Sequence, residues 1–142
     1  MPNVSGTNFS TTDPLKPSPG SSVDAGIRVH REVFNTTTHT LSGTVNGAIA
    51  AKVREGNTVL KVRMKSDANL SATNFTVGTA AAPTKDATAQ AGGAAGVTKE
   101  FEINLTALDD DPLTAPEDII IVPSVNWPAG AAVVTMVEVC KR

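Results

Sequence analysis

The sequence predicts an all-β protein, an antiparallel β-sandwich of jelly-roll or immunoglobulin-like type with about seven or eight strands. Three observations support this. The composition is rich in Thr and Val and poor in aromatic residues, with one Trp and no Tyr. Several segments alternate apolar and polar residues with a period of two. Gly, Pro and Asn interrupt these segments at short intervals, which leaves little room for helices.

The 142 residues are enough for one domain, preceded by a segment of different composition. Residues 1–25 contain four prolines and few apolar side chains, so they cannot bury enough surface to offset the entropy lost on ordering. We expect either a flexible tail or an extended arm that orders against a neighbouring subunit, with Val4, Phe9 and Leu15 as candidate anchors. The predicted boundaries are an arm over residues 1–25 and a β-sandwich over residues 26–142.

The alternating segments define the expected strands. The first covers residues 27–34, with Ile27, Val29 and Val33 facing the core and Arg31 interrupting that face. The clearest alternation follows, with Leu60, Val62 and Met64 inward and Lys61, Arg63 and Lys65 outward. Further strands are expected over 49–53, 74–78 and 97–105, the last with Phe101, Ile103 and Leu105 inward. Residues 79–96 are rich in Ala and Gly and predict a long surface loop.

Residues 119–122 are three isoleucines and a valine in succession, which predicts a strand covered on both faces. Pro123 cannot donate to a ladder, so the strand should become irregular there. The next strand, over residues 131–139, is expected to run antiparallel to it. Trp127 lies between the two, and we expect it to form part of a partner-binding surface.

Charge is unevenly distributed although the net charge is only −2. Up to Lys65 there are eight Lys and Arg against four Asp and Glu, and beyond it four against ten. This pattern reflects either solvated faces or complementarity between neighbouring copies. The basic residues Lys52, Arg54, Lys61, Arg63 and Lys65 could line adjacent strands across a hairpin at Gly56. The stripe has no interleaved aromatic residues, so a solvated or protein-facing role is favoured over phosphate contact, and no nucleic-acid partner is expected.

No motif indicates catalysis, so no catalytic residue, cofactor or metal site is predicted. His30 and His39 are expected to be exposed strand residues, and Cys140 a passive thiol. Asp109, Asp110 and Asp111 suggest turn chemistry, with a weak cation site as the alternative. We see no secretory signal and no apolar run that could span a bilayer, so no membrane partner is expected.

Four segments carry a family resemblance: Leu-Lys-Val-Arg-Met at 60–64, Phe-Thr-Val-Gly-Thr-Ala-Ala-Ala-Pro-Thr at 75–84, Asp-Ile-Ile-Ile-Val-Pro-Ser-Val at 118–125 and Ala-Ala-Val-Val-Thr-Met-Val-Glu-Val at 131–139. Together they resemble the small β-sandwich proteins that decorate tailed-bacteriophage capsids, also called cement or auxiliary head proteins. The resemblance carries over no site residue.

The resemblance implies a non-enzymatic virion protein that stabilises the outer capsid surface, with the major capsid protein as partner. It also implies a homo-oligomer, with a trimer favoured, made in the host cytoplasm, whose arm reaches across capsid subunits. The alternative function is a carbohydrate- or receptor-binding module of a phage fibre or adhesin. That alternative would favour exposed aromatic side chains.

Overall fold

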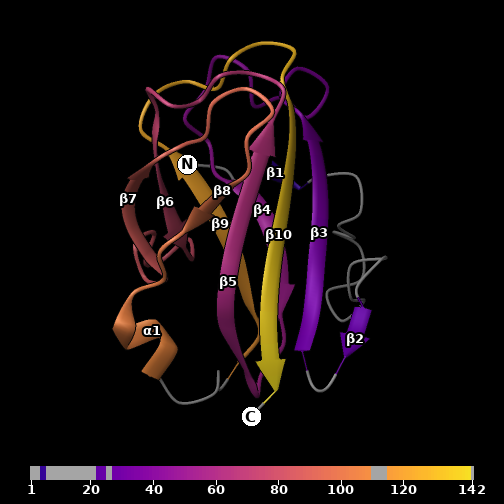
Figure 1. The fold of residues 1–142 in the computed structure, drawn as a ribbon, viewed down its shortest axis with the longest axis vertical. Helices are drawn as coiled ribbons and strands as arrows, with labels where there is room; N and C mark the ends of the chain where they lie inside the picture. Colours follow the sequence, from indigo (N-terminus) through magenta and orange to yellow (C-terminus); the bar gives the residue numbers. More distant parts are fainter. Residues whose placement is uncertain (1–3, 6–21, 25–26, 110–114, 142) are drawn as a thin grey trace.

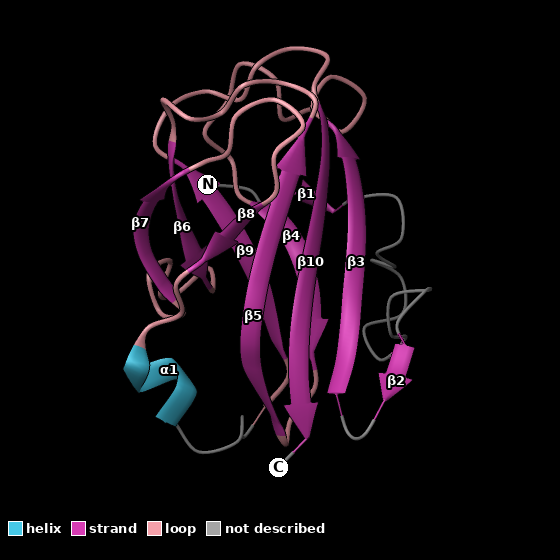
Figure 2. Cartoon of the chain, viewed as in Figure 1, coloured by secondary structure: helices cyan, strands magenta, loops and turns pink. Residues whose placement is uncertain are grey.

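The computed structural model describes residues 4–5, 22–24, 27–109 and 115–141, and side chains over 27–108 and 115–140. The described residues form ten strands and one short helix (Figure 2). The strands are β1 (Val4–Ser5), β2 (Ser22–Asp24), β3 (Ile27–Asn35), β4 (Ala48–Val53), β5 (Asn57–Ser66), β6 (Asn74–Gly78), β7 (Ala87–Ala91), β8 (Lys99–Phe101), β9 (Glu117–Pro123) and β10 (Ala132–Lys141). The helix is α1 (Leu105–Asp109).

Two sheets face each other, as Figure 1 shows. Strands β3 to β10 form two four-stranded antiparallel sheets, in the orders β4-β9-β6-β7 and β3-β10-β5-β8. Successive strands cross from one sheet to the other, except for β6 and β7, which pair with each other. This arrangement is a jelly roll. It confirms the predicted all-β sandwich and selects one of the two predicted types.

The N-terminal segment contributes one short strand to an edge of each sheet. β1 pairs in parallel with β4, and β2 pairs antiparallel with β3. Each sheet therefore has five strands in all.

The core lies between the sheets, and β9 is buried on both faces as predicted. Ile119 and Ile121 are fully buried and face the core, and Ile120 on the opposite side of the strand is only 2% exposed. On that outer side Ile49 of β4 is paired with Ile120 and is also buried. Gly78 of β6 is paired with Ile120 as well, and a Cβ there would collide with the Ala82 carbonyl oxygen. The loop after β6 therefore packs directly on this outer face.

Residues 119–122 and 131–139 lie in consecutive strands as predicted, but these strands do not pair with each other. β9 and β10 are consecutive strands, but they belong to different sheets. The turn at Gly56 likewise carries the chain from one sheet to the other and does not form a hairpin. Local turn signals fix where the chain reverses, but they do not specify whether the next strand pairs with the last or crosses to the facing sheet.

The predicted inward face of β3 is also wrong. The residues singled out by alternation, Ile27, Val29 and Val33, are half-buried or exposed. The buried side chains belong to the other face: His30, Glu32 and Phe34. Pairing with β10 decides the orientation, because His30 lies opposite Val137 and Phe34 opposite Val133, both of them core residues.

In β5 the predicted inward face is correct for Val62 and Met64 but not for Leu60, which is half-buried. The register shifts between Glu138 and Val139 of β10, so that Val59 pairs with Val139 and faces the core instead. A bulge of this kind reverses the alternation for the residues beyond it.

The predicted strand over residues 97–105 is shorter than expected. Phe101 is buried and Ile103 packs partly buried against the core, but Leu105 begins α1 and is 79% exposed. The side-chain amide of Gln90 donates to the Glu102 carbonyl and accepts from the Glu102 N–H, both at 2.9 Å. These backbone groups are therefore satisfied without a continuing strand. Gln90 itself lies in β7, within the stretch predicted to be a long loop.

Candidate protein-binding surface

Of the four residues predicted to bind a partner, Trp127 is the one whose side chain the structure describes. It is 2% exposed and belongs to the core cluster. Its ring packs against Phe75 with centroids 5.4 Å apart, and its indole N–H donates to the Asn46 carbonyl at 2.9 Å. This corrects the expectation that the side chain forms a contact surface. Val4 lies in β1, and Phe9 and Leu15 fall outside the described residues.

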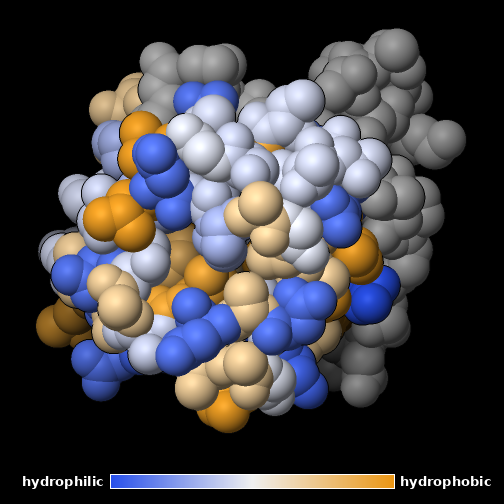
Figure 3. Space-filling view, turned by 90° about the horizontal axis from the view of Figure 1, so that it is seen from above, coloured by the Kyte–Doolittle hydropathy of each residue, from blue (hydrophilic) through white to orange (hydrophobic). Residues whose placement is uncertain are grey.

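Trp127 instead links two loops at one end of the sandwich through backbone hydrogen bonds. Its backbone N–H donates to the Thr44 carbonyl at 2.8 Å, and its carbonyl accepts from Gly43 at 3.0 Å. The same end exposes single valines, Val45, Val97 and Val125, at 40%, 54% and 51%. Figure 3 views the molecule from this end, where apolar areas are interspersed with hydrophilic ones. Scattered exposure of this kind is ordinary for a protein surface.

The two histidines differ from the expectation of exposed strand residues. His30 is 4% exposed, and burial, reinforced by Arg28 and Arg54, lowers its pKa. His39 is half-buried, its ring packs edge-on against Phe34, and its Nδ1 accepts from the Asn35 N–H at 3.0 Å. Over the described side chains, no group of three or more His, Cys, Asp and Glu is placed to hold a metal ion. Asp110 and Asp111, part of the possible cation site, lie outside the described residues.

Asp86 is the most perturbed acid among the described residues. It is 4% exposed, and burial raises its pKa to about 6, with Glu117 adding to the shift and Lys85 opposing it. The Lys85 ammonium pairs with the Glu117 carboxylate at 2.8 Å. The backbone carbonyl of Asp86 accepts from the Asn104 N–H at 2.7 Å. Asp86 thus sits where β7 meets the segment leading to α1.

The predicted basic stripe does not exist as one surface. Lys52 lies on β4, opposite Asp118 of β9, whereas Lys61, Arg63 and Lys65 project from β5 in the other sheet. Because β4 and β5 are in different sheets, no side chain of the first can continue the row formed by the second. Arg31, predicted to interrupt a core face, projects from β3 on the same outer face as the β5 cations.

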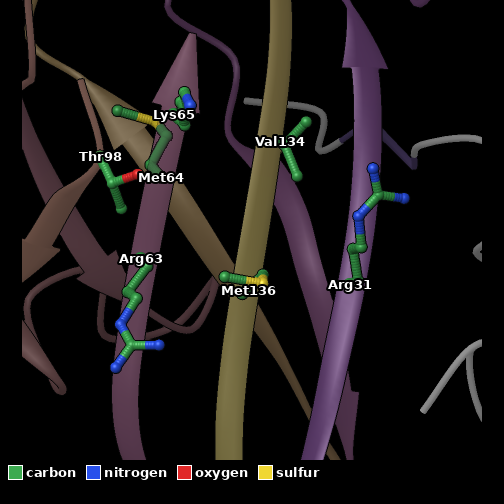
Figure 4. Close-up of a pocket in the computed structure, with 7 residues that line it drawn as sticks. All are labelled: Arg31, Arg63, Met64, Lys65, Thr98, Val134 and Met136. Atoms are coloured by element: carbon green, nitrogen blue, oxygen red, sulfur yellow. The ribbon is translucent and has the colours of Figure 1, made fainter. Parts of the chain in front are cut away.

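A groove of about 260 Å³ lies on this outer face (Figure 4). Its lining residues come from β3, β10, β5 and the segment before β8: Arg31, Arg63, Met64, Lys65, Thr98, Val134 and Met136. Figure 4 shows Val134 and Met136 on the central strand, with Arg31 on one side and Arg63 and Lys65 on the other. The groove therefore has an apolar middle and cationic sides.

The electrostatics of this face are partly fixed by ion pairs. The Arg63 guanidinium donates to Glu100 at 2.9 Å and to Glu138 at 3.1 Å. The hydrogen bond to Glu100 and the charge of Glu138 raise the pKa of Arg63. The hydrogen bond between Arg63 and Glu100 also lowers the pKa of Glu100. All three side chains are at least partly exposed, so the pairs orient Arg63 more than they stabilise the fold.

Comparison with known proteins gives structural neighbours. No protein-family model matches the sequence, and no curated protein matches it. A chain from the capsid of Ralstonia phage GP4 superposes with a TM-score of 0.65 at 11% identity, covering 99% of each chain. A chain from the cyanophage Pam1 capsid asymmetric unit has a TM-score of 0.53 at 18% identity, covering 92% of this chain and 100% of the other.

A third neighbour is a chain from the acidic stable capsid of Helicobacter pylori bacteriophage KHP30. Its TM-score is 0.50 at 12% identity, with 83% of this chain and 90% of that chain covered. All three neighbours come from phage capsids, which agrees with the resemblance to phage capsid-associated β-sandwiches. At these identities the likeness concerns the fold. Among the described residues, no helix has the length and apolar character needed to cross a membrane.

The groove could not be predicted from alternation within single strands. Alternation identified the outward cations of β5, but it assigned Arg31 to an interrupted core face and could not place β10 between β3 and β5. The signal that was available is Val-Thr-Met at 134–136, whose apolar residues alternate with the buried Val133, Thr135 and Val137. A strand that is apolar on both faces near Met136 indicates that its outer face is at least partly covered or meets a partner.

Proposed function

We propose that the protein is a non-enzymatic structural component of a phage virion that binds and stabilises the outer surface of the capsid, as decoration or cement proteins do. The observation that supports this best is the match to a chain of the Ralstonia phage GP4 capsid over 99% of both chains. A match of this extent leaves no sizeable part of either chain unaccounted for. The other two phage capsid neighbours support a virion structural role in the same way.

The fold alone would not support so specific a proposal. Jelly rolls occur in viral capsid proteins, lectins and other unrelated proteins, and a fold does not determine a function. The rival proposal of a carbohydrate-binding module draws no support from the described aromatic residues. Phe34, Phe75, Phe101 and Trp127 are all at most 2% exposed. None of them is presented for stacking on a sugar ring.

The proposal includes partners. The protein binds the major capsid protein, forms a homo-oligomer for which we favour a trimer, and is made in the host cytoplasm before it joins the particle. Residues 1–25 form an arm that contacts neighbouring subunits, with Val4, Phe9 and Leu15 as anchors. The edge positions of β1 and β2 support this arm, because a segment that pairs at both sheet edges is well placed to continue onto a neighbour.

Co-sedimentation tests the proposal. Purified full-length protein is mixed with capsid shells of its own phage that were assembled without it, and the shells are pelleted. We expect the protein to pellet with the shells in a saturable amount. A protein that stays in the supernatant at every concentration contradicts the proposal, and glycan binding under the same conditions supports the rival. A variant lacking residues 1–25, with its folding checked by circular dichroism, tests the arm separately.

A further inference from the structure

The outer faces of the two sheets differ in how well they are covered. On the β4-β9-β6-β7 sheet, Ile49 and Ile120 are 7% and 2% exposed although they point away from the core. On the β3-β10-β5-β8 sheet, the outward residues Val134 and Met136 are only half-buried, and Ile27 is 38% exposed. The second sheet is therefore the one that presents uncovered apolar surface.

The strand register places cations on both sides of that apolar surface. Met136 lies directly opposite Arg31 of β3 on one side and Arg63 of β5 on the other. Val134, two residues earlier on the same face, lies opposite Lys65 of β5. Directly opposed side chains in a sheet have Cβ atoms about 5 Å apart. A single partner side chain resting on Met136 is therefore within reach of both arginines.

The charge of this face has the opposite sign to that of the whole chain. Within the paired stretches of β3, β10, β5 and β8, four cations and two anions project from it: Arg31, Lys61, Arg63, Lys65, Glu100 and Glu138. Their sum is +2, while the chain as a whole carries −2, so the remaining residues sum to −4. Glu100 and Glu138 are already engaged by Arg63. Arg31 and Lys65 are exposed at the sides of the groove.

We propose that the outer face of β3, β10 and β5, centred on Met136, is the surface that docks onto the capsid, and that the capsid partner presents carboxylate side chains around an apolar side chain. This rests on the proposed function and names the surface that it uses. The apolar side chain packs on Met136 and Val134, where the unbranched thioether adapts to its shape. Partner carboxylates bind the Arg31 guanidinium and the Lys65 ammonium.

Co-sedimentation of variants with shells tests the proposal, and each single charge variant and the control lower the net charge by one unit. Lys65→Gln and Arg31→Gln remove the cations at the groove, and Met136→Gln removes its apolar centre without a charge change. Thr88→Glu is the control, since Thr88 is exposed on β7 of the other sheet. Circular dichroism confirms that each variant is folded.

We expect the double variant Arg31→Gln with Lys65→Gln to bind shells at least about tenfold more weakly, and each single variant about threefold more weakly, because rim charges steer and orient docking. Met136→Gln should also weaken binding about tenfold, since a polar side chain replaces the apolar centre. The control should bind within about twofold of the wild-type protein.

The outcomes separate the two proposals. Wild-type protein that fails to pellet with shells overturns the proposed function, and this docking surface with it. Wild-type protein that pellets, together with groove variants that pellet equally well, overturns the docking surface alone. Self-association of the wild-type protein without shells, abolished in the groove variants while shell binding persists, also overturns it and assigns the face to a second copy of the chain.

Discussion

Replacing Trp127 with Ala should strongly destabilise the fold. The side chain is 2% exposed, its ring packs 5.4 Å from that of Phe75, and its N–H donates to Asn46. Truncating a buried Trp to Ala typically costs about 3 to 5 kcal/mol, because contacts are lost and a cavity remains. A domain of this size is usually stable by about 5 to 15 kcal/mol, so the loss is a large part of the total.

A second substitution, Trp127→Phe, separates the contribution of the hydrogen bond from the contribution of ring packing. Phe keeps most of the packing on Phe75 but removes the N–H that donates to the Asn46 carbonyl at 2.9 Å. Losing one hydrogen bond and leaving this half-buried acceptor without its partner costs about 1 to 3 kcal/mol. We therefore expect Trp127→Phe to fall between the wild-type protein and Trp127→Ala in the free energy of unfolding.

Urea unfolding followed by far-ultraviolet circular dichroism measures both effects. Fluorescence cannot be used for the variants, because the chain has one Trp and no Tyr. Val125→Ala is the matched control, since Val125 is on the same loop but 51% exposed, and it should change stability by less than about 0.5 kcal/mol. A Trp127→Ala variant that loses less than about 1 kcal/mol refutes the assignment of Trp127 to the core.

Three further predictions concern a buried acid, a glycine packed against a loop and a glutamine that bonds to the backbone. Burial raises the pKa of Asp86 to about 6 from 3.8, so this residue favours the folded state most below pH 4 and loses that contribution as the pH rises through 6. A shift of about two pKa units corresponds to about 3 kcal/mol, so Asp86→Asn should be more stable than the wild-type protein at pH 8 by up to that amount, with little difference at pH 4. The measurement is urea unfolding at both pH values, and equal differences at both would contradict the buried position of Asp86. The lowered pKa of His30 has the opposite effect, because it removes stability as the pH falls below about 6.5. Asp86→Asn must therefore be compared with the wild-type protein at the same pH. Gly78→Ala should lower the melting temperature by the equivalent of about 1 to 3 kcal/mol, because its Cβ would collide with the Ala82 backbone, whereas Thr88→Ala on the exposed side of β7 should have little effect. Gln90→Ala removes both hydrogen bonds to the Glu102 backbone and should cost about 1 to 3 kcal/mol in urea unfolding, and an unchanged midpoint would show that this contact contributes nothing.

The sequence was sufficient to predict the fold class because burial in β9 and alternation in β5 are local signals. Three isoleucines in succession required cover on both faces, and Ile119, Ile120 and Ile121 have it. The jelly-roll topology was not accessible in the same way. Whether β9 pairs with β10 or crosses to the other sheet depends on contacts between residues distant in the chain, which turn residues do not encode.

The orientation of β3 was mispredicted for a related reason. Its two faces are similarly mixed, one with Ile27, Val29, Arg31 and Val33 and the other with His30, Glu32 and Phe34. Hydropathy favours the first face, but register with β10 buries the second. The cost of burying Glu32 is reduced by a hydrogen bond that its carboxylate accepts from the Val33 N–H at 3.1 Å.

The candidate surface was only half visible in the sequence. The outward cations Lys61, Arg63 and Lys65 follow from alternation within one strand. Their apolar neighbours Val134 and Met136 come from a strand about 70 residues later, and the pairing that brings them together is set by the fold. A docking surface spread over three paired strands has no local sequence signature, so the structure was needed to recognise it.

Electron cryo-microscopy of shells incubated with the protein tests the central claim most directly. Shells assembled without the protein and shells saturated with it are compared in a difference map. We predict added density on the outer surface of the shell, into which the jelly roll fits with the β3-β10-β5 face toward the capsid. Absence of added density contradicts the proposed role in the virion, and density in which that face points into solvent contradicts the docking surface.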